Sequence, residues 1–241
     1  MILVQIQDFI NQVRGKLIVS CQALPGTPLD DPYILAAIAK AVEIGGAAAL
    51  RADGAKNIAA MRRVTELPII GIRKTENRQE TYITPRFEHA QEVAEAGADL
   101  IALQATNPRL DNCPPLSILI ARIHSELGLG VMADISTVAE AEEAMAAGAD
   151  LVATTLSGYT PHTAHRETPD LELVYELARR GIPVIAEGCY HTPQQVVKAL
   201  ENGAIAVVAG TAITMPDRIT RLFVSHIESA RQGGREGGIG N

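Results

Sequence analysis

Eight short apolar segments recur along the chain, and each is followed by a longer segment with the apolar spacing of a helix. The apolar segments are rich in Val, Ile, Leu and Ala and cover residues 17–22, 47–51, 69–74, 99–103, 129–133, 150–155, 183–187 and 205–210. Strands that are apolar at nearly every position are buried on both faces, which is typical of a parallel sheet covered by helices. The pattern therefore predicts an α/β fold with a parallel sheet.

The intervening segments predict helices at 32–44, 54–65, 86–96, 116–126, 137–147, 170–180, 193–202 and 216–230. Eight strand–helix units in 241 residues match a single (β/α)8 TIM barrel, whose usual length is about 250 residues. A doubly wound open sheet is the alternative, but it usually has fewer strands and a Gly-rich loop after the first. Residues 23–29 read ALPGTPL, without that loop. Ile6, Phe9, Ile10 and Val13 add a short N-terminal helix.

A glycine repeat supports the barrel. Gly46, Gly97, Gly148 and Gly203 each stand between an expected helix and the next expected strand, with separations of 51, 51 and 55 residues. Glycine is common just past a helix C-terminus. Each separation spans two strand–helix units, so the repeating unit is a pair of them. We expect one TIM-barrel domain over residues 1–229. Residues 230–241 contain five glycines and predict a flexible C-terminal tail.

Charge and composition exclude several classes of partner. The chain has 21 basic and 28 acidic residues, and it contains three Phe, five Tyr and no Trp. A net charge of −7 argues against a surface that tracks nucleic-acid phosphates, and sparse aromatic residues argue against base stacking. No apolar run is long enough for a membrane helix. Three widely spaced cysteines predict reduced thiols in a cytoplasmic protein, and no metal-binding motif is present.

The active site of such a barrel lies at the carboxyl ends of the strands. Polar or charged residues that end or follow the expected strands include Gln22, Arg51, Lys74, Gln104, Asp134 and Glu187. Charged side chains at the ends of apolar strands require partners, so a set of structural ion pairs is one interpretation. Because all of them converge on one end of the barrel, we favour a functional site.

Lys74 and Glu187 give the sharpest inference. They end the third and seventh strands, which are four positions apart in an eight-membered ring, so they face each other across the barrel mouth. An amine and a carboxylate on opposite sides of a small ligand suit the transfer of a proton from one face of a carbon to the other. A Lys74–Glu187 salt bridge is the structural alternative. In an apolar mouth beside Asp134, we expect the pKa of Glu187 to be raised.

The segments after the seventh and eighth strands predict a phosphate site, as is usual in this fold. Gly188 and Gly210 permit close approach of the backbone to an anion, and Thr211 adds a hydroxyl group. The expected ligand is therefore a small phosphorylated molecule.

The stretches SCQAL (20–24), MADIST (132–137) and TTLSGYT (154–160) together resemble segments of N-acetylmannosamine-6-phosphate 2-epimerases, and the resemblance spans residues 15–225. It implies a TIM barrel that interconverts N-acetylmannosamine 6-phosphate and N-acetylglucosamine 6-phosphate without an organic cofactor, in sialic acid catabolism. It also implies that Lys74 and Glu187 are catalytic and that Gln22, Arg51 and Asp134 contact the phosphorylated amino sugar. A homodimer is compatible with this fold.

Three positions depart from the family pattern. Cys189 and Met215 replace arginines that the family usually has, and Gln104 replaces an aspartate. The phosphate would then depend on Gly188, Gly210 and Thr211, with His191 or Arg218 as further donors. Two alternatives to the epimerase stay open: a Schiff-base lyase that uses Lys74 on a phosphosugar, and a non-catalytic phosphosugar-binding barrel.

Overall fold

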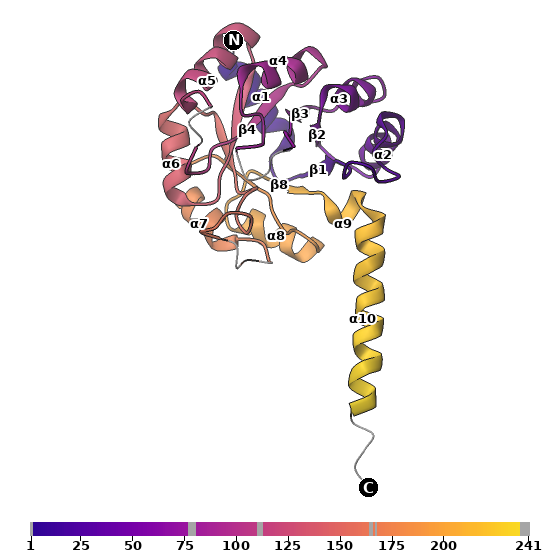
Figure 1. Ribbon diagram of the computed structural model, residues 1–241. Helices are drawn as coiled ribbons and strands as arrows, with labels where there is room; N and C mark the ends of the chain where they lie inside the picture. The colour runs from indigo at the N-terminus through magenta and orange to yellow at the C-terminus, as the bar shows by residue number, and fades with distance from the viewer. Residues whose placement is uncertain (1, 77–80, 110–112, 164–165, 167, 237–241) are drawn as a thin grey trace.

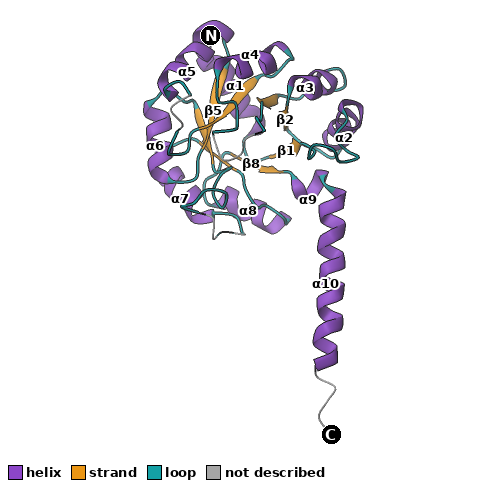
Figure 2. Ribbon diagram, viewed as in Figure 1, coloured by secondary structure: helices purple, strands orange, loops and turns teal. Residues whose placement is uncertain are grey.

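The computed structural model describes residues 2–76, 81–109, 113–163, 166 and 168–236. Its centre is a closed barrel of eight parallel strands in chain order, with β8 paired to β1 (Figure 2). The predicted (β/α)8 barrel is thereby confirmed. The strands are β1 (Leu17–Cys21), β2 (Ala49–Asp53), β3 (Ile69–Ile72), β4 (Leu100–Gln104), β5 (Gly130–Asp134), β6 (Leu151–Ala153), β7 (Val184–Ala186) and β8 (Ala206–Ala209).

Helices lie at one end of this barrel, around its outside and, in the last case, projecting away from it (Figures 1 and 2). They are α1 (Ile2–Val13), α2 (Pro32–Ile44), α3 (Ala55–Arg62), α4 (Phe87–Glu95), α5 (Leu116–Arg122), the π-helix η1 (Ile123–Leu127), α6 (Val138–Ala146), α7 (Leu171–Arg179), α8 (Pro193–Glu201), α9 (Thr211–Thr214) and α10 (Pro216–Glu236). The sequence predicts neither the π turn that continues α5 nor the four-residue helix α9. Both are too short to carry an apolar period of their own.

Alternate residues of each strand belong to different hydrophobic clusters. Ile18, Ile70, Met132 and Ile185 pack together in the barrel interior, whereas their neighbours along the strands, such as Val19, pack outward against the helices. This is the alternation expected of β-strands, in which successive side chains point to opposite faces. The inward-facing positions just beyond the end of each strand therefore lie at the mouth of the barrel.

Helix α1 closes the N-terminal end of the barrel. Its residues Ile6, Phe9, Ile10 and Val13 are buried in the interior cluster, as their helical spacing predicts. Gly130 opens β5 directly beneath this helix, and a Cβ atom there would lie 2.0 Å from Cδ1 of Ile6. The interior is therefore filled from this side, and the opposite, carboxyl end remains for a ligand.

The glycine repeat has the predicted place in the fold. Gly46, Gly97, Gly148 and Gly203 follow α2, α4, α6 and α8 and have φ angles of 94°, 105°, 102° and 96°. These left-handed conformations are easily adopted by glycine and end each helix so that the next strand can begin within three residues.

The chain after β3 differs from the expected strand 69–74. The strand ends at Ile72, and Lys74 then forms an isolated antiparallel bridge with Ile83. Two further backbone hydrogen bonds of 2.9 Å join Thr75 to Tyr82 and Thr84 to Arg73. The polar residues 73–75 leave the parallel ladder because this local pairing satisfies their backbone groups. As a consequence, Tyr82 comes close to Lys74.

The C-terminal segment also differs from the expectation. The sequence predicts a helix that ends at 230, but helix α10 continues to Glu236; the flexibility of the tail from 230 stays a prediction. Each further turn adds hydrogen bonds to an existing helix, which offsets the poor helix propensity of the glycines at 233 and 234. The rest of the predicted tail, 237–241, lies outside the described residues. Within the described part of the chain, no helix is both long and apolar enough to cross a membrane.

Candidate active site

A cavity of about 250 Å³ opens at the carboxyl ends of the strands. It is lined by side chains and backbone from the ends of the strands and the loops that follow: Ser20, Gln22, Leu24, Arg51, Ile72, Lys74, Tyr82, Ile83, Thr155, Leu156, Tyr159, Glu187, Gly188, Cys189, Tyr190, His191, Val208, Gly210, Thr211, Met215 and Arg218. Seven of the eight site residues predicted from the sequence are among them. The eighth, Asp134, is fully buried at the end of β5 and forms an ion pair with Arg51.

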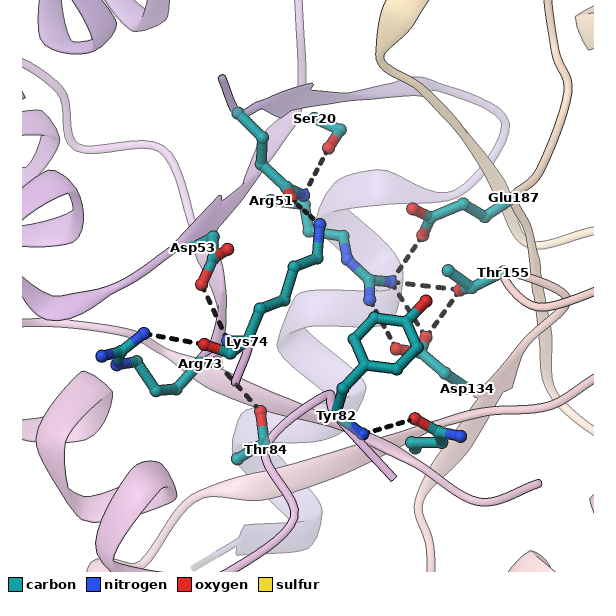
Figure 3. Close-up of polar contacts among 12 residues, drawn as sticks. Ser20, Arg51, Asp53, Arg73, Lys74, Tyr82, Thr84, Asp134, Thr155 and Glu187 are labelled. Carbon is teal, nitrogen blue, oxygen red and sulfur yellow. Dashed lines mark hydrogen bonds and ion pairs between the residues drawn. The ribbon is translucent and has the colours of Figure 1, made fainter. Parts of the chain in front are cut away.

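Arg51 joins two carboxylates at the base of this cavity (Figure 3). Its Nη1 and Nη2 atoms donate hydrogen bonds of 2.9 and 2.5 Å to the two carboxylate oxygens of Asp134, and Nη1 lies 2.6 Å from Oε2 of Glu187. Thr155 completes the cluster by donating a hydrogen bond of 2.6 Å to Asp134. A fork-shaped guanidinium that binds one carboxylate with both arms has a fixed orientation, so it also fixes the second carboxylate.

Burial decides the electrostatics of this cluster. The side chains of Arg51, Asp134 and Glu187 are 1 %, 0 % and 12 % exposed. Burial raises the pKa of the Glu187 carboxyl above its ordinary value, and the nearby Asp134 acts in the same direction. Arg51 and Lys74 oppose this rise without cancelling it. The direction of this shift is the one predicted from the sequence, and a raised pKa makes the carboxyl a better proton donor.

The same cluster keeps Arg51 charged. Burial by itself lowers the pKa of Arg51, but its ion pairs with Asp134 and Glu187 outweigh that effect and hold the pKa above the ordinary value. The structural ion pairs weighed in the sequence analysis thus exist, and they join Arg51 to both carboxylates. They lie in the wall of the cavity, so they also shape the site.

Lys74 stands two residues beyond the end of β3 and is held from both its backbone and its side chain (Figure 3). Its backbone N–H donates a hydrogen bond of 2.9 Å to Asp53, and its Nζ atom donates to Oε1 of Gln22. Gln22 in turn donates a hydrogen bond of 2.8 Å to Ser20. The amine is therefore aimed from the β3 side of the mouth toward the interior, by residues from the first and second strands.

Tyr82 enters the cavity from the loop that pairs with the end of β3. Its backbone N–H donates a hydrogen bond of 2.9 Å to Oε1 of Gln104, whose amide group donates to Thr106. Gln104, one of the three residues that depart from the family pattern, thus holds the Tyr82 loop and is not among the residues that line the cavity. Tyr82 is not among the site residues predicted from the sequence, because only the local pairing after β3 brings it here. Ser20 is not among them either, although the alternation from Ile18 along β1 indicates it.

A further part of the cavity wall is formed by the residues that follow β7 and β8. Gly188 has a φ angle of 107°, and Cys189 next to it has an unusual positive φ of 59° for a residue with a side chain. Thr154 holds this turn, since its hydroxyl donates to the Glu187 carbonyl (2.8 Å) and accepts from the Glu187 N–H (3.0 Å). The Cys189 thiol lies 3.6 Å from the Tyr159 hydroxyl.

The residues predicted to bind phosphate lie in this part of the cavity wall. Gly188, Gly210 and Thr211 all line the cavity, and so do the two further donors considered in the sequence analysis, His191 and Arg218. The two neutral residues at family arginine positions, Cys189 and Met215, line it as well. One cavity thus holds both the acid–base residues and a set of backbone and side-chain donors suited to an anion.

Comparisons with known proteins identify the family of this chain. Residues 35–229 match the family NanE, described as "Putative N-acetylmannosamine-6-phosphate epimerase". A relative from Caldanaerobacter subterraneus subsp. tengcongensis is named "Putative N-acetylmannosamine-6-phosphate 2-epimerase". It is 48 % identical to this chain over 227 residues, which cover 93 % of this chain and 96 % of the relative. The "Bifunctional enzyme NanE/NanK" of Brucella melitensis is 45 % identical over 93 % of this chain, which spans 43 % of that protein.

A solved structure shows the same fold at high similarity. The N-acetylmannosamine-6-phosphate 2-epimerase from Clostridium perfringens superimposes with a TM-score of 0.86 and 44 % identity, covering 90 % of this chain and 95 % of that one. The family match covers most of the chain, and the identities extend over nearly all of it. The chain therefore belongs to the NanE family of N-acetylmannosamine-6-phosphate epimerases.

Proposed function

We propose that this chain interconverts N-acetylmannosamine 6-phosphate and N-acetylglucosamine 6-phosphate, without an organic cofactor, by removing and returning the proton at C2. The observation that carries the proposal is the placement of Lys74 and Glu187 in one cavity, at the ends of opposite strands of an eight-stranded barrel. The names of the relatives support the substrate, since they specify this 2-epimerisation.

The two sugars differ only in the configuration at C2. In the open-chain form C2 is adjacent to the C1 aldehyde, so loss of its proton gives an enolate whose charge rests on O1. One of the two groups takes the proton from one face of C2, and the other returns a proton to the opposite face. The new C2–H bond then has the inverted configuration, and no atom is gained or lost.

The contacts of each residue suggest its role. Glu187 has a raised pKa and one oxygen held by Arg51, so it is oriented and able to exchange a proton. Lys74 presents an amine held by Gln22 and suits either proton transfer or stabilisation of the enolate oxygen. Arg51 already binds two carboxylates, so we assign to it the orientation of Glu187.

The other predicted residues fit the rest of the sugar. Gln22 lines the cavity beside Lys74 and can bind a hydroxyl or the acetamido group, whereas buried Asp134 acts through Arg51 and Thr155. Gly188, Gly210 and Thr211 receive the phosphate. A sugar phosphate carries up to two negative charges and does not cross a membrane unaided, so we expect the reaction to take place in the cytoplasm.

We also infer that the chain forms a homodimer through α10, which projects away from the barrel (Figure 1). This helix exposes Leu222, Phe223, Val224 and Ile227, each at least 45 % exposed. Burying one such side chain stabilises a protein by about 1.5 to 3 kcal/mol, so a helix of this composition favours a partner. We assign this partner to a second copy of the chain, because the neighbouring helices α8 and α2 expose apolar residues of their own, among them Val197 and Tyr33.

The test of the proposed reaction is direct interconversion by the purified protein. Incubation of either sugar phosphate alone should give the same equilibrium mixture of both, followed by NMR. Lys74→Met and Glu187→Gln should each reduce the rate by at least about a thousandfold while the far-UV circular dichroism stays unchanged. No interconversion by the wild-type protein would overturn the proposal.

A further inference from the structure

We propose that Arg218, on the first turn of α10, supplies the positive charge that binds the phosphate of the substrate. This assignment rests on the proposed function, since it concerns the same cavity and a phosphorylated substrate. The residue lines the cavity but stands outside every strand end from which the sequence analysis built the site. Its role makes α10 part of the binding site.

Few cationic side chains line the cavity. Three of its lining residues are Lys or Arg, namely Arg51, Lys74 and Arg218. Arg51 is bound to two carboxylates and Lys74 donates to Gln22, so both are engaged in the acid–base part of the site. Arg51 and its two carboxylates together carry one negative charge, so this cluster would repel the phosphate group of a substrate.

The cavity wall that follows β7 and β8 offers hydrogen-bond donors but little charge. Gly188, Gly210 and Thr211 offer backbone and hydroxyl donors there, and Cys189 and Met215 are neutral. Arg218 lines the same cavity from α10, and within the described part of the chain no ion pair engages its guanidinium. Burial and the Cys189 thiol raise the pKa of Tyr159, another lining residue, to about 12, and Arg218 opposes this rise.

The start of α10 is anchored to the barrel. Thr214 is buried, and its hydroxyl donates a hydrogen bond of 2.9 Å to the carbonyl oxygen of Ser20 at the end of β1. One residue further, the carbonyl of Met215 accepts backbone hydrogen bonds of 3.1 and 3.0 Å from Arg218 and Ile219. The Arg218 backbone is therefore fixed relative to β1 and β8, and its side chain extends from a defined point.

In this proposal the backbone and the Arg218 side chain contribute differently to phosphate binding. Backbone groups near Gly188 and Gly210 surround the phosphate at short range, and one guanidinium at the rim balances part of its charge. A guanidinium binds a phosphate with two parallel N–H donors, which gives direction as well as attraction. The local positive charge matters in a chain whose net charge is −7.

The experiment compares Arg218→Ala with wild type on two substrates, N-acetylmannosamine 6-phosphate and neutral N-acetylmannosamine. The matched control is Arg221→Ala, because Arg221 lies one turn further along α10 and does not line the cavity. We expect Arg218→Ala to raise KM for the phosphorylated sugar about tenfold or more with little change in kcat. It should weaken competitive inhibition by inorganic phosphate similarly and leave turnover of the neutral sugar unchanged.

The outcomes separate this assignment from the proposed function. Equal KM and equal phosphate inhibition in wild type and Arg218→Ala would overturn the role of Arg218 while leaving the epimerase intact. If the wild type has no epimerase activity, the proposed function fails. The role of Arg218 is then decided by a second measurement, the increase in the free energy of unfolding of each protein on adding inorganic phosphate, compared with chloride of equal ionic strength. Loss of that stabilisation in Arg218→Ala but not in Arg221→Ala supports the assignment, and equal stabilisation of all three overturns it.

Discussion

Nη1 of Arg51 donates a hydrogen bond of 2.6 Å to Oε2 of Glu187, although the two residues are 136 positions apart in the chain. The same guanidinium is held by both carboxylate oxygens of Asp134. Asp134 thus fixes Arg51, and Arg51 fixes Glu187, so that a carboxyl with a raised pKa has one defined position in the cavity wall. A proton-transferring group needs this kind of fixed geometry, because a shift of about 1 Å can cost a hundredfold in rate.

Arg51→Ala should remove both stability and activity. It leaves Asp134 buried without its ion-pair partner, and breaking a buried pair costs about 3 to 5 kcal/mol in the free energy of unfolding. Urea denaturation measures this loss. Arg51→Lys is the control, because it retains the charge but not the fork; it should lose less stability than Arg51→Ala and still show a strongly reduced kcat. Full activity of Arg51→Lys would contradict the positioning role.

Glu187→Gln should change how stability depends on pH. Folding raises the pKa of Glu187, so its ionised form is less favourable in the folded state than in the unfolded chain. Its contribution to stability is therefore fully present below the ordinary value of 4.5 and is lost as the pH rises through the raised pKa. Glutamine does not titrate. The free energy of unfolding of Glu187→Gln minus that of wild type should rise over this pH window, and a constant difference would contradict the shift.

Gln22→Glu should move the pH–rate profile. The substitution places a carboxylate where Lys74 now donates to an amide oxygen, which stabilises the charged ammonium. If Lys74 must lose its proton to act as a base, activity should appear only at higher pH. Gln22→Met, of similar size but without an acceptor, separates this electrostatic effect from a general loss of binding. An unchanged profile in Gln22→Glu would exclude Lys74 as a base within the measured range.

Substitutions on α10 should dissociate the inferred dimer. Phe223 is 68 % exposed, and Leu222 beside it is 54 % exposed. Replacing both by Asp should produce a monomer in sedimentation experiments without lowering the helical content of the barrel, because neither side chain is part of the barrel core. Arg221→Ala should remain dimeric. A wild-type protein that sediments as a monomer at every concentration would remove the basis for the dimer.

Much of this fold could be predicted from local patterns. The eight apolar strands, the glycines that end α2, α4, α6 and α8, and the interior phase of Ile70 and Ile72 all follow from periodicities along the chain. These patterns report which face of an element is buried, and a closed parallel barrel then brings the strand ends together. The residues Gln22, Arg51, Lys74 and Glu187 could be found in this way.

The remaining features depend on contacts between distant residues. Nothing local in the sequence indicates that Arg51 binds both Asp134 and Glu187, because that choice of partners is made only in the closed barrel. Tyr82 reaches the cavity through a pairing of the chain after β3 with itself, held by Gln104. The glycines after 230 predict the end of the last helix, but α10 continues past Gly233 and Gly234 to Glu236.

The central claim is that a proton leaves C2 and a proton from the enzyme returns, and exchange in D₂O tests it most directly. The protein would be incubated with protonated N-acetylmannosamine 6-phosphate in D₂O, and both sugars would be examined by NMR and mass spectrometry. The account predicts one deuterium at C2 of the N-acetylglucosamine 6-phosphate formed, with no label at any other carbon, and no incorporation with Lys74→Met or Glu187→Gln. Interconversion without deuterium at C2 would contradict it.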